Sequence, residues 1–159
     1  MIEMLFLLGF SLHNIEEALW LPQWSKRARR FHREVSENEF RFSVIIVTAV
    51  GYLLTFQYYI WSDVYAWSKY VYLGFVLMMV INAVFPHLLA TIVLKSYAPG
   101  TITGLMLNVP VGLYILATDI NGRGDLIALG IALAGVAAVT LAIINILFKA
   151  APTLLSGNE

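Results

Sequence analysis

The sequence contains no cysteine. This absence excludes thiolate metal sites, disulfide bonds and a cysteine nucleophile. Charged residues are also scarce, at 13% of the 159 residues, against about a quarter in an average globular protein. The formal net charge is zero, so the charge balance gives no reason to expect a nucleic acid as partner. Apolar residues make up 60% of the chain, a composition typical of a protein that sits in the lipid bilayer.

Five segments are long and apolar enough to cross about 30 Å of hydrocarbon as helices, at about 1.5 Å per residue. They cover residues 4–20, 42–61, 70–94, 102–118 and 126–148. A polar, basic loop over residues 22–41 separates the first two. We therefore predict an all-α fold, in which residues 1–159 form one polytopic transmembrane bundle of about five helices. The first segment carries Glu3 where a signal peptide would be basic, so we expect it to be retained.

Lysine and arginine are unevenly distributed between the loops. Six of the ten fall within residues 22–41, and the alternation of helices places Lys95 and Lys149 on the same side. Only Lys69 and Arg123 fall on the other side. Because basic short loops stay in the cytoplasm, we predict a multi-pass protein of the cytoplasmic membrane with its N-terminus outside and its C-terminus inside.

Three ionisable residues lie inside the first apolar segment. His13, Glu16 and Glu17 share one helical face, because positions i, i+3 and i+4 are neighbours across a turn. Charged groups at bilayer depth cost several kcal/mol unless they are paired, neutralised or turned toward a polar interior. The triplet therefore predicts a functional site, and Glu16 and Glu17 are its candidate catalytic residues.

His87 is expected at the same depth as the two glutamates, in the cytoplasmic half of the membrane. His13, Glu16, Glu17 and His87 would suit a divalent metal such as zinc, iron or manganese. A metal would acidify water or polarise a substrate oxygen, with Glu16 or Glu17 as general base. Because the site lies in the inner leaflet, we expect a hydrolase with a lipid-like substrate.

Polar residues of other helices should surround this site at the same depth, as groups that orient ligands or bind substrate. They are Asn82, Thr91, Asn108 and Asn145. Asn82 and His87 are five residues apart, about 140° around a helix, so both face the site only if Pro86 changes the local winding. Asn108 and Asn145 could equally be hydrogen-bonding contacts between helices. They belong to or adjoin two stripes of small residues, each of which predicts a close helix contact. One stripe is Gly100, Gly104, Asn108 and Gly112, and the other is Gly130, Ala134, Ala138 and Ala142, which Asn145 follows.

Two other classes of protein explain the same residues. Intramembrane histidine and glutamate chains relay protons or bind cations in carriers, so a proton- or cation-coupled small-solute carrier is the second hypothesis. A structural membrane protein with a buried polar network is the third. One chain is short of ligands for a two-metal centre, but a homodimer could share them.

The stretch His13-Asn14-Ile15-Glu16-Glu17 resembles the motif of the HxxEE-motif family of small prokaryotic multi-pass membrane proteins. Asn82-Ala83-Val84-Phe85-Pro86-His87 and Tyr97-Ala98-Pro99-Gly100-Thr101-Ile102-Thr103 fit the same resemblance. The family's activity is unassigned, so the resemblance supports the choice of residues and names no reaction. It also implies that the Tyr97 turn lies on the cytoplasmic side, where it could cover the site or bind a headgroup.

Overall fold

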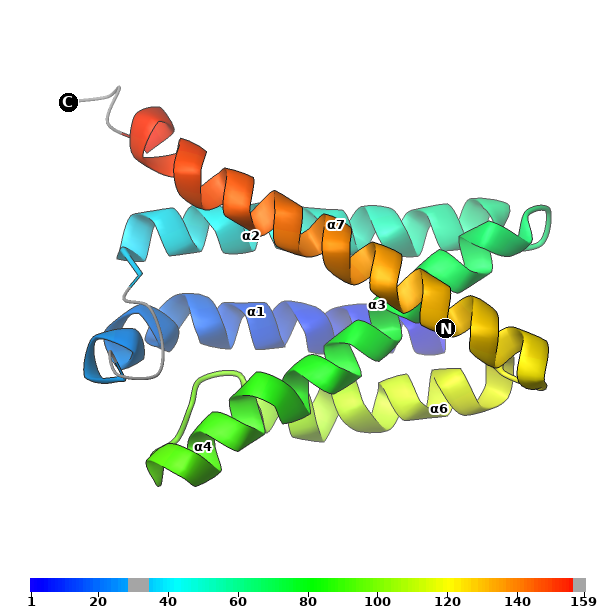
Figure 1. Ribbon diagram of the computed structural model, residues 1–159, viewed down its shortest axis with the longest axis horizontal. Helices are drawn as coiled ribbons and strands as arrows, with labels where there is room; N and C mark the ends of the chain where they lie inside the picture. The colour runs from blue at the N-terminus through cyan, green and yellow to red at the C-terminus, as the bar shows by residue number, and fades with distance from the viewer. Residues whose placement is uncertain (29–34, 156–159) are drawn as a thin grey trace.

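In a computed structural model, residues 1–28 and 35–155 are described, and this part of the chain consists of helices and short connections without a strand (Figure 1). The all-α prediction is confirmed. In chain order, the elements are α1 (Ile2–Arg27), α2 (Glu37–Trp61), α3 (Ala66–Asn82), η1 (Ala83–Leu88), α4 (Leu89–Leu94), α5 (Thr101–Thr103), η2 (Gly104–Asn108), α6 (Val109–Asp119) and α7 (Arg123–Leu155).

Four helical stretches are long and apolar enough to cross a membrane. They are Glu37–Trp61, Ala66–Leu94, Thr101–Asp119 and Arg123–Ala151. The second and third each join several elements, with the π-helical turns η1 and η2 inside them. The chain is therefore a membrane protein, as its composition predicts. α1 is long enough but lies outside this group, since its polar residues lower its hydropathy. It still runs the length of the bundle beside α2 and α6 (Figure 1).

The helices extend beyond their predicted ends. α1 continues through Pro22 to Arg27, and α2 already begins at Glu37, so both ends of the predicted loop 22–41 are helical. Apolar length marks where a helix leaves the hydrocarbon, whereas lysine, arginine and glutamate are good helix formers that can continue it into water. The middle of the loop, with Arg29, Arg30 and Arg33, lies outside the described residues.

The predicted helix over residues 70–94 is interrupted where the sequence places Pro86. Phe85 has non-helical angles (φ −130°, ψ 113°), and the Phe85–Pro86 peptide bond is cis. Proline has no N–H to donate and clashes with the preceding turn, so a break at this point is expected. The helix is therefore kinked between α3 and α4.

An apolar core fills one half of the bundle and a polar layer the other. Phe6 and Phe10 of α1 pack edge-on against Phe75 of α3, with ring centroids 5.8 and 5.1 Å apart. Ile115 of α6 belongs to the same core. The next turn of α1 brings His13 to the level of η1 and α5, where the polar layer begins. The core thus fixes the helices that carry the polar side chains.

The two small-residue stripes behave differently. Gly104 and Gly112 are buried, and a side chain at either would meet Ala83 or Val80 of the neighbouring segment at less than 3 Å. On α7, by contrast, Gly130, Ala134, Ala138 and Ala142 are all exposed. Within the chain this stripe does not make the expected contact, because α7 packs on α3 through the turn at Ala132 and Leu133, which lies against Gly74.

Candidate functional site

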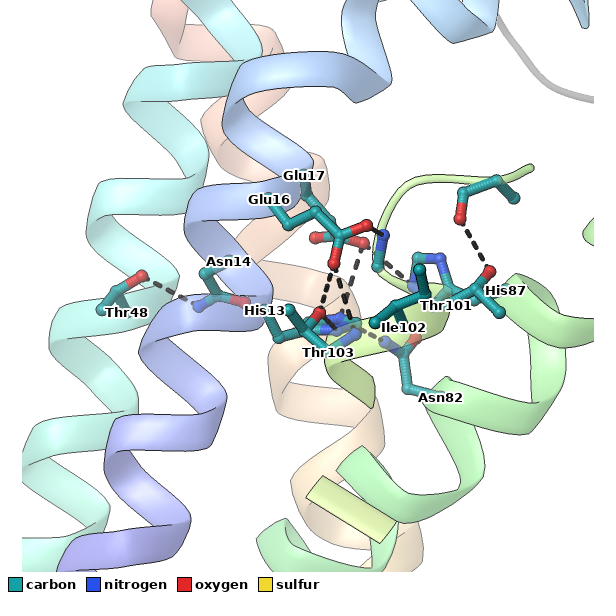
Figure 2. Close-up of polar contacts among 12 residues, drawn as sticks. His13, Asn14, Glu16, Glu17, Thr48, Asn82, His87, Thr101, Ile102 and Thr103 are labelled. Carbon is teal, nitrogen blue, oxygen red and sulfur yellow. Dashed lines mark hydrogen bonds and ion pairs between the residues drawn. The ribbon is translucent and has the colours of Figure 1, made fainter. Parts of the chain in front are cut away.

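Two segments far apart in sequence bring His13, Glu17 and His87 together. His13 and Glu17 lie one turn apart on α1, and His87 in η1 follows the helix interruption at Phe85 and Pro86 (Figure 2). Glu17 Oε1 lies 2.9 Å from Nε2 of His87 and 3.7 Å from Nε2 of His13. One ligand atom from each residue lies within 4.8 Å of the others. Both histidines are buried and Glu17 is partly buried. We call these three residues the His/Glu cluster.

The break at Pro86 lets Asn82 and His87 face the same site. Asn82 Nδ2 lies 3.3 Å from Nε2 of His13, while His87 reaches Glu17. On a regular helix the two side chains would point about 140° apart. The condition stated from the sequence is therefore met, because the chain between them does not follow one helix.

Glu16 turns away from the cluster and binds the segment between α4 and η2. Its Oε1 accepts hydrogen bonds from the Gly100 amide at 2.8 Å and from the Tyr97 hydroxyl. Its Oε2 accepts from Thr103 Oγ1 at 2.6 Å and from the Thr103 amide at 3.3 Å. Four donors thus satisfy this buried carboxylate. Of the four predicted ligands, three converge, while Glu16 ties residues 97–103 to α1.

Thr103 connects Glu16 to the cluster and indicates the tautomer of His13. The Thr103 hydroxyl donates to Glu16, so it is an acceptor for His13 Nδ1, which lies 3.3 Å away. On the other side of the ring, the Asn82 amide group donates to His13 Nε2. These contacts place the proton on Nδ1 and leave the Nε2 lone pair as the acceptor for the Asn82 amide, on the side of the ring that faces the cluster. A neutral imidazole in this form is the one that binds metals.

Gly100 lies next to both imidazole rings and closes one side of the site. Its φ is +91°, a conformation that residues with a side chain rarely adopt. A Cβ at this position would lie 2.8 Å from Cε1 of His13 and 2.9 Å from Cε1 of His87. The rings themselves meet edge-on, with centroids 5.0 Å apart. Glycine is therefore required here both by the backbone and by space.

Tyr97 and Thr91 hold the turn from its two ends. Tyr97 lies outside the membrane-spanning segments. Its partial burial and, as a smaller cause, its hydrogen bond to Glu16 raise its pKa to about 12. The hydroxyl therefore stays protonated and remains a donor to Glu16. Thr91 of α4 contacts the Thr101 hydroxyl at 2.9 Å and accepts from the Ala98 amide at 3.0 Å. Both residues, expected near the site, position the turn.

The two remaining asparagines differ in their placement. Asn108 in η2 is buried, as the stripe of small residues predicts, and neither of its side-chain polar atoms has a hydrogen-bond partner. It packs against Gly9, whose added Cβ would lie 3.0 Å from Asn108 Oδ1. Asn145 is exposed on α7 and donates to the Leu141 carbonyl of its own helix. The expectation that Asn145 lies at the site is corrected, because the stripe that led to it faces outward.

Two hollows reach the site, and both are lined by Leu94 and Pro99. The larger, of about 980 Å³, lies along α1 and is lined by Leu12, Ile15, Glu16 and Tyr97 among others; we call it the α1 hollow. The smaller, of about 250 Å³, is lined by Phe85, Pro86 and His87. One hollow thus contacts Glu16 and the other His87. A small molecule in either would lie next to the polar layer.

Thr103 and the Gly100 amide are the site residues that the sequence analysis did not single out. Both lie in the stretch of residues 97–103 that carries the family resemblance, and Gly100 also begins a stripe of small residues. A backbone amide has no side-chain signature, and a threonine near the start of an apolar helix is common. The Pro99-Gly100 pair was the available signal, because it marks a turn with a positive φ.

The donor atoms of the cluster suit a divalent cation. Two imidazole nitrogens and one carboxylate oxygen are the ligands that catalytic zinc sites combine, with a further position left for water or substrate. The same set with manganese or iron(II) is chemically reasonable. Alternatively, the Glu17 carboxylate and the His87 ring can exchange a proton across their 2.9 Å contact. The arrangement therefore supports either metal binding or proton transfer.

Comparison with known proteins agrees with the motif. The family described as "Protein of unknown function with HXXEE motif" matches residues 4–115, which include the whole cluster. The chain is similar to the uncharacterized protein YrkK of Bacillus subtilis (strain 168), with 48% identity over 113 residues, or 70% of each chain. No solved structure matches it. Since the family match covers more than half of the chain, the resemblance is confirmed and this protein belongs to the HXXEE family.

Proposed function

We propose that this protein is a metal-dependent membrane enzyme, a hydrolase of lipid-like substrates, with zinc, iron or manganese held by His13, Glu17 and His87. The observation that carries the proposal is the convergence of three ligand atoms within 4.8 Å in a buried layer. Ionisable groups are costly at this depth, and a divalent cation would compensate the carboxylate. A metal there would supply an acidified water and polarise a substrate oxygen.

The residues around the cluster support this proposal by fixing the ligands. His13 is oriented by Thr103, which is itself held by Glu16, so a carboxylate acts on the imidazole through a hydroxyl. Partners of this kind fix the ring and its tautomer in metal sites. The space between Gly100 and both rings is too small for a side chain, so the turn lies close against the imidazoles. The cluster is thus organised before any ligand arrives.

Glu16 and Glu17 receive different roles in the proposal. Both contacts of Glu17 to the histidines fall on Oε1, so we assign Oε2 as the acceptor for a proton of the reacting water. Glu16 already accepts four hydrogen bonds, which stabilise its charged form and make it a poor base. We therefore assign Glu16 as a positioning residue.

Metal analysis by inductively coupled plasma mass spectrometry tests the proposal on detergent-purified protein. We expect about one equivalent of zinc, iron or manganese in the unchanged chain. Glu17→Gln removes a ligand and should lose nearly all of it. Glu16→Gln should reduce metal affinity by about 10- to 100-fold, as loss of an outer partner does. Glu3→Gln, at the far end of α1, is the matched control and should retain the metal.

A metal content that is the same in Glu17→Gln and in the unchanged chain would refute the assigned ligands. Absence of metal from every sample, even after incubation with zinc, iron and manganese salts, would refute the proposal. A proton- or cation-coupled carrier would then be favoured, and proton flux in liposomes would be measured next. If metal is present, hydrolysis is assayed as fatty acid released from ester lipids in vesicles.

A further inference from the structure

The α1 hollow runs along the outward face of α1, beside the cluster. Leu12 and Ile15 form an apolar wall there and are about half exposed. Further along the helix, Leu19, Trp20 and Trp24 continue the apolar lining. Polar groups join it there from Gln23 of α1 and Ser96 of the opposite segment. This polar end adjoins the end of α1, where the chain leaves the membrane. The hollow is therefore apolar toward the membrane interior, and its uncharged polar groups lie at the end toward the membrane surface.

Glu16 and Tyr97 lie between these two ends, where a lipid has its ester linkage. Among the described residues that line the hollow, Glu16 is the only charged one. A second negative charge at this level would be repelled by the carboxylate, whereas an uncharged ester or alcohol would not. The hollow's volume of about 980 Å³ lies at the upper end of the range of about 300–1,000 Å³ for small-ligand sites.

We propose that the α1 hollow binds a neutral single-chain acyl ester of the bilayer, with its tail along Leu12 and Ile15 and its ester beside Glu16 and Tyr97. The polar end of the lipid then lies at Gln23 and Ser96. This inference names the substrate class of the same site and in that respect rests on the proposed function. The binding itself needs no metal, so it can be tested separately.

The connection to the cluster runs through Thr103. Thr103 lines the hollow, and its hydroxyl lies 3.3 Å from His13 Nδ1. An ester at this level is therefore separated from the cluster by one side chain. Hydrolysis would add one water across the acyl carbon–oxygen bond and release a fatty acid and an alcohol. The fatty acid carries a charge that Glu16 disfavours, which would promote its release.

Photocrosslinking in a defined bilayer tests the inference. The probe is a monoacylglycerol with a diazirine in its chain, added to the full-length protein in nanodiscs of ether-linked phosphatidylcholine. Labelled peptides are identified by mass spectrometry. We expect labels on α1 between residues 12 and 23 and on residues 94–103. A fatty acid of the same chain, with the same diazirine, should label these peptides about tenfold less, since its carboxylate meets Glu16.

Two matched substitutions locate the site. Leu12→Trp fills the tail end of the hollow and should weaken labelling about tenfold, equivalent to about 1.4 kcal/mol. Leu8→Trp changes the same residue type one turn earlier on α1, outside the lining, and should label like the unchanged chain. Both side chains are exposed, so neither change should unfold the bundle; gel filtration of each variant checks this.

The inference is overturned if Leu12→Trp labels as strongly as Leu8→Trp, or if the fatty acid probe labels as strongly as the monoacylglycerol. All samples are measured with and without a chelator. Hollow-specific labelling in a protein that never holds metal would leave this inference standing and refute the proposed function. Metal binding without such labelling would refute this inference and leave the proposed function standing.

Discussion

At the scale of single residues, the two adjacent glutamates of the motif serve different structures. Glu17 lies one turn after His13 on the same face of α1 and belongs to the cluster. Glu16 lies about 100° from Glu17 around the helix and points to residues 97–103. The spacing H-x-x-E-E thus lets one face of α1 supply a ligand and a neighbouring face fasten the turn. Exchanging the two roles would require a rotation of α1 that the aromatic contacts of Phe6 and Phe10 oppose.

Gly100→Ala should destabilise the protein by about 1–3 kcal/mol, because a side chain at φ +91° is strained and would also contact both histidine rings. The measurement is thermal unfolding in detergent, together with metal content. We expect both to fall.

Gly135→Ala is the control for this substitution. Gly135 lies inside α7, and an added Cβ would meet nothing within 4 Å. Alanine is favoured over glycine in a helix by about 1 kcal/mol, so this variant should be as stable as the unchanged chain or more so. Equal stability of Gly100→Ala and Gly135→Ala would contradict the tight contact described for Gly100.

Much of the cluster could be predicted from the sequence. Helical spacing places His13 and Glu17 on one face, and a comparison of depths brings His87 to the same level. The contacts of Glu16 could not be predicted in this way. Its donors are two backbone amides and two hydroxyls, and their positions depend on the turn between α4 and η2, which does not follow helical spacing. Asn145 was misplaced for another reason. Small residues permit close packing on α7, but they do not specify which of its faces packs.

At the scale of helices, α3 and α7 meet where Gly74 has no side chain. A Cβ on Gly74 would lie 2.8 Å from the Ala132 carbonyl carbon, a backbone atom that cannot move aside. Gly74→Val should therefore lower the free energy of unfolding by about 1–3 kcal/mol, as overpacking does. Metal content should change little, because α7 contributes no residue to the cluster in the described part of the chain. Thermal unfolding and metal analysis check the two statements.

Ala134→Val is the matched substitution on the exposed stripe of α7 and should leave the melting temperature within about 2 °C. A loss of stability in Ala134→Val as large as in Gly74→Val would mean that the stripe does form a contact, in a homodimer for example.

The helices themselves were predictable because their apolar length is set by the membrane. The second, third, fourth and fifth predicted segments correspond to the four stretches able to span it. The ends of the helices could not be predicted in the same way, because the residues that mark where a helix leaves the hydrocarbon differ from those that end a helix. The interruption after α3 was foreseen from Pro86, but the geometry that turns both Asn82 and His87 to one site required the structure.

At the scale of the whole molecule, the prediction concerns its orientation. The C-terminal end of α1, the start of α2, the connection after α4 and the C-terminal end of α7 lie at the same end of the bundle (Figure 1). Eight of the ten basic residues lie in or beside these segments, so we predict this end in the cytoplasm. Because the chain has no cysteine, single cysteines can report the side directly. On intact cells, a membrane-impermeant maleimide should label Asp63→Cys and leave Ser36→Cys unlabelled.

Both positions are exposed in the structure, so a difference in labelling reflects the membrane. Permeabilised cells provide the control, in which both cysteines should react. Labelling of Ser36→Cys alone on intact cells would invert the predicted orientation and would move the cluster to the outer leaflet.

The placement of α7 has a consequence for the order in which the bundle is assembled. α7 crosses α2 and α3 obliquely on one side of the molecule (Figure 1). The residues of the His/Glu cluster, and the turn that binds Glu16, all come from segments that precede α7 in the chain. Membrane helices form individually before they associate. During synthesis the cluster can therefore come together while α7 is still in the ribosome, and α7 docks at Gly74 as the final step.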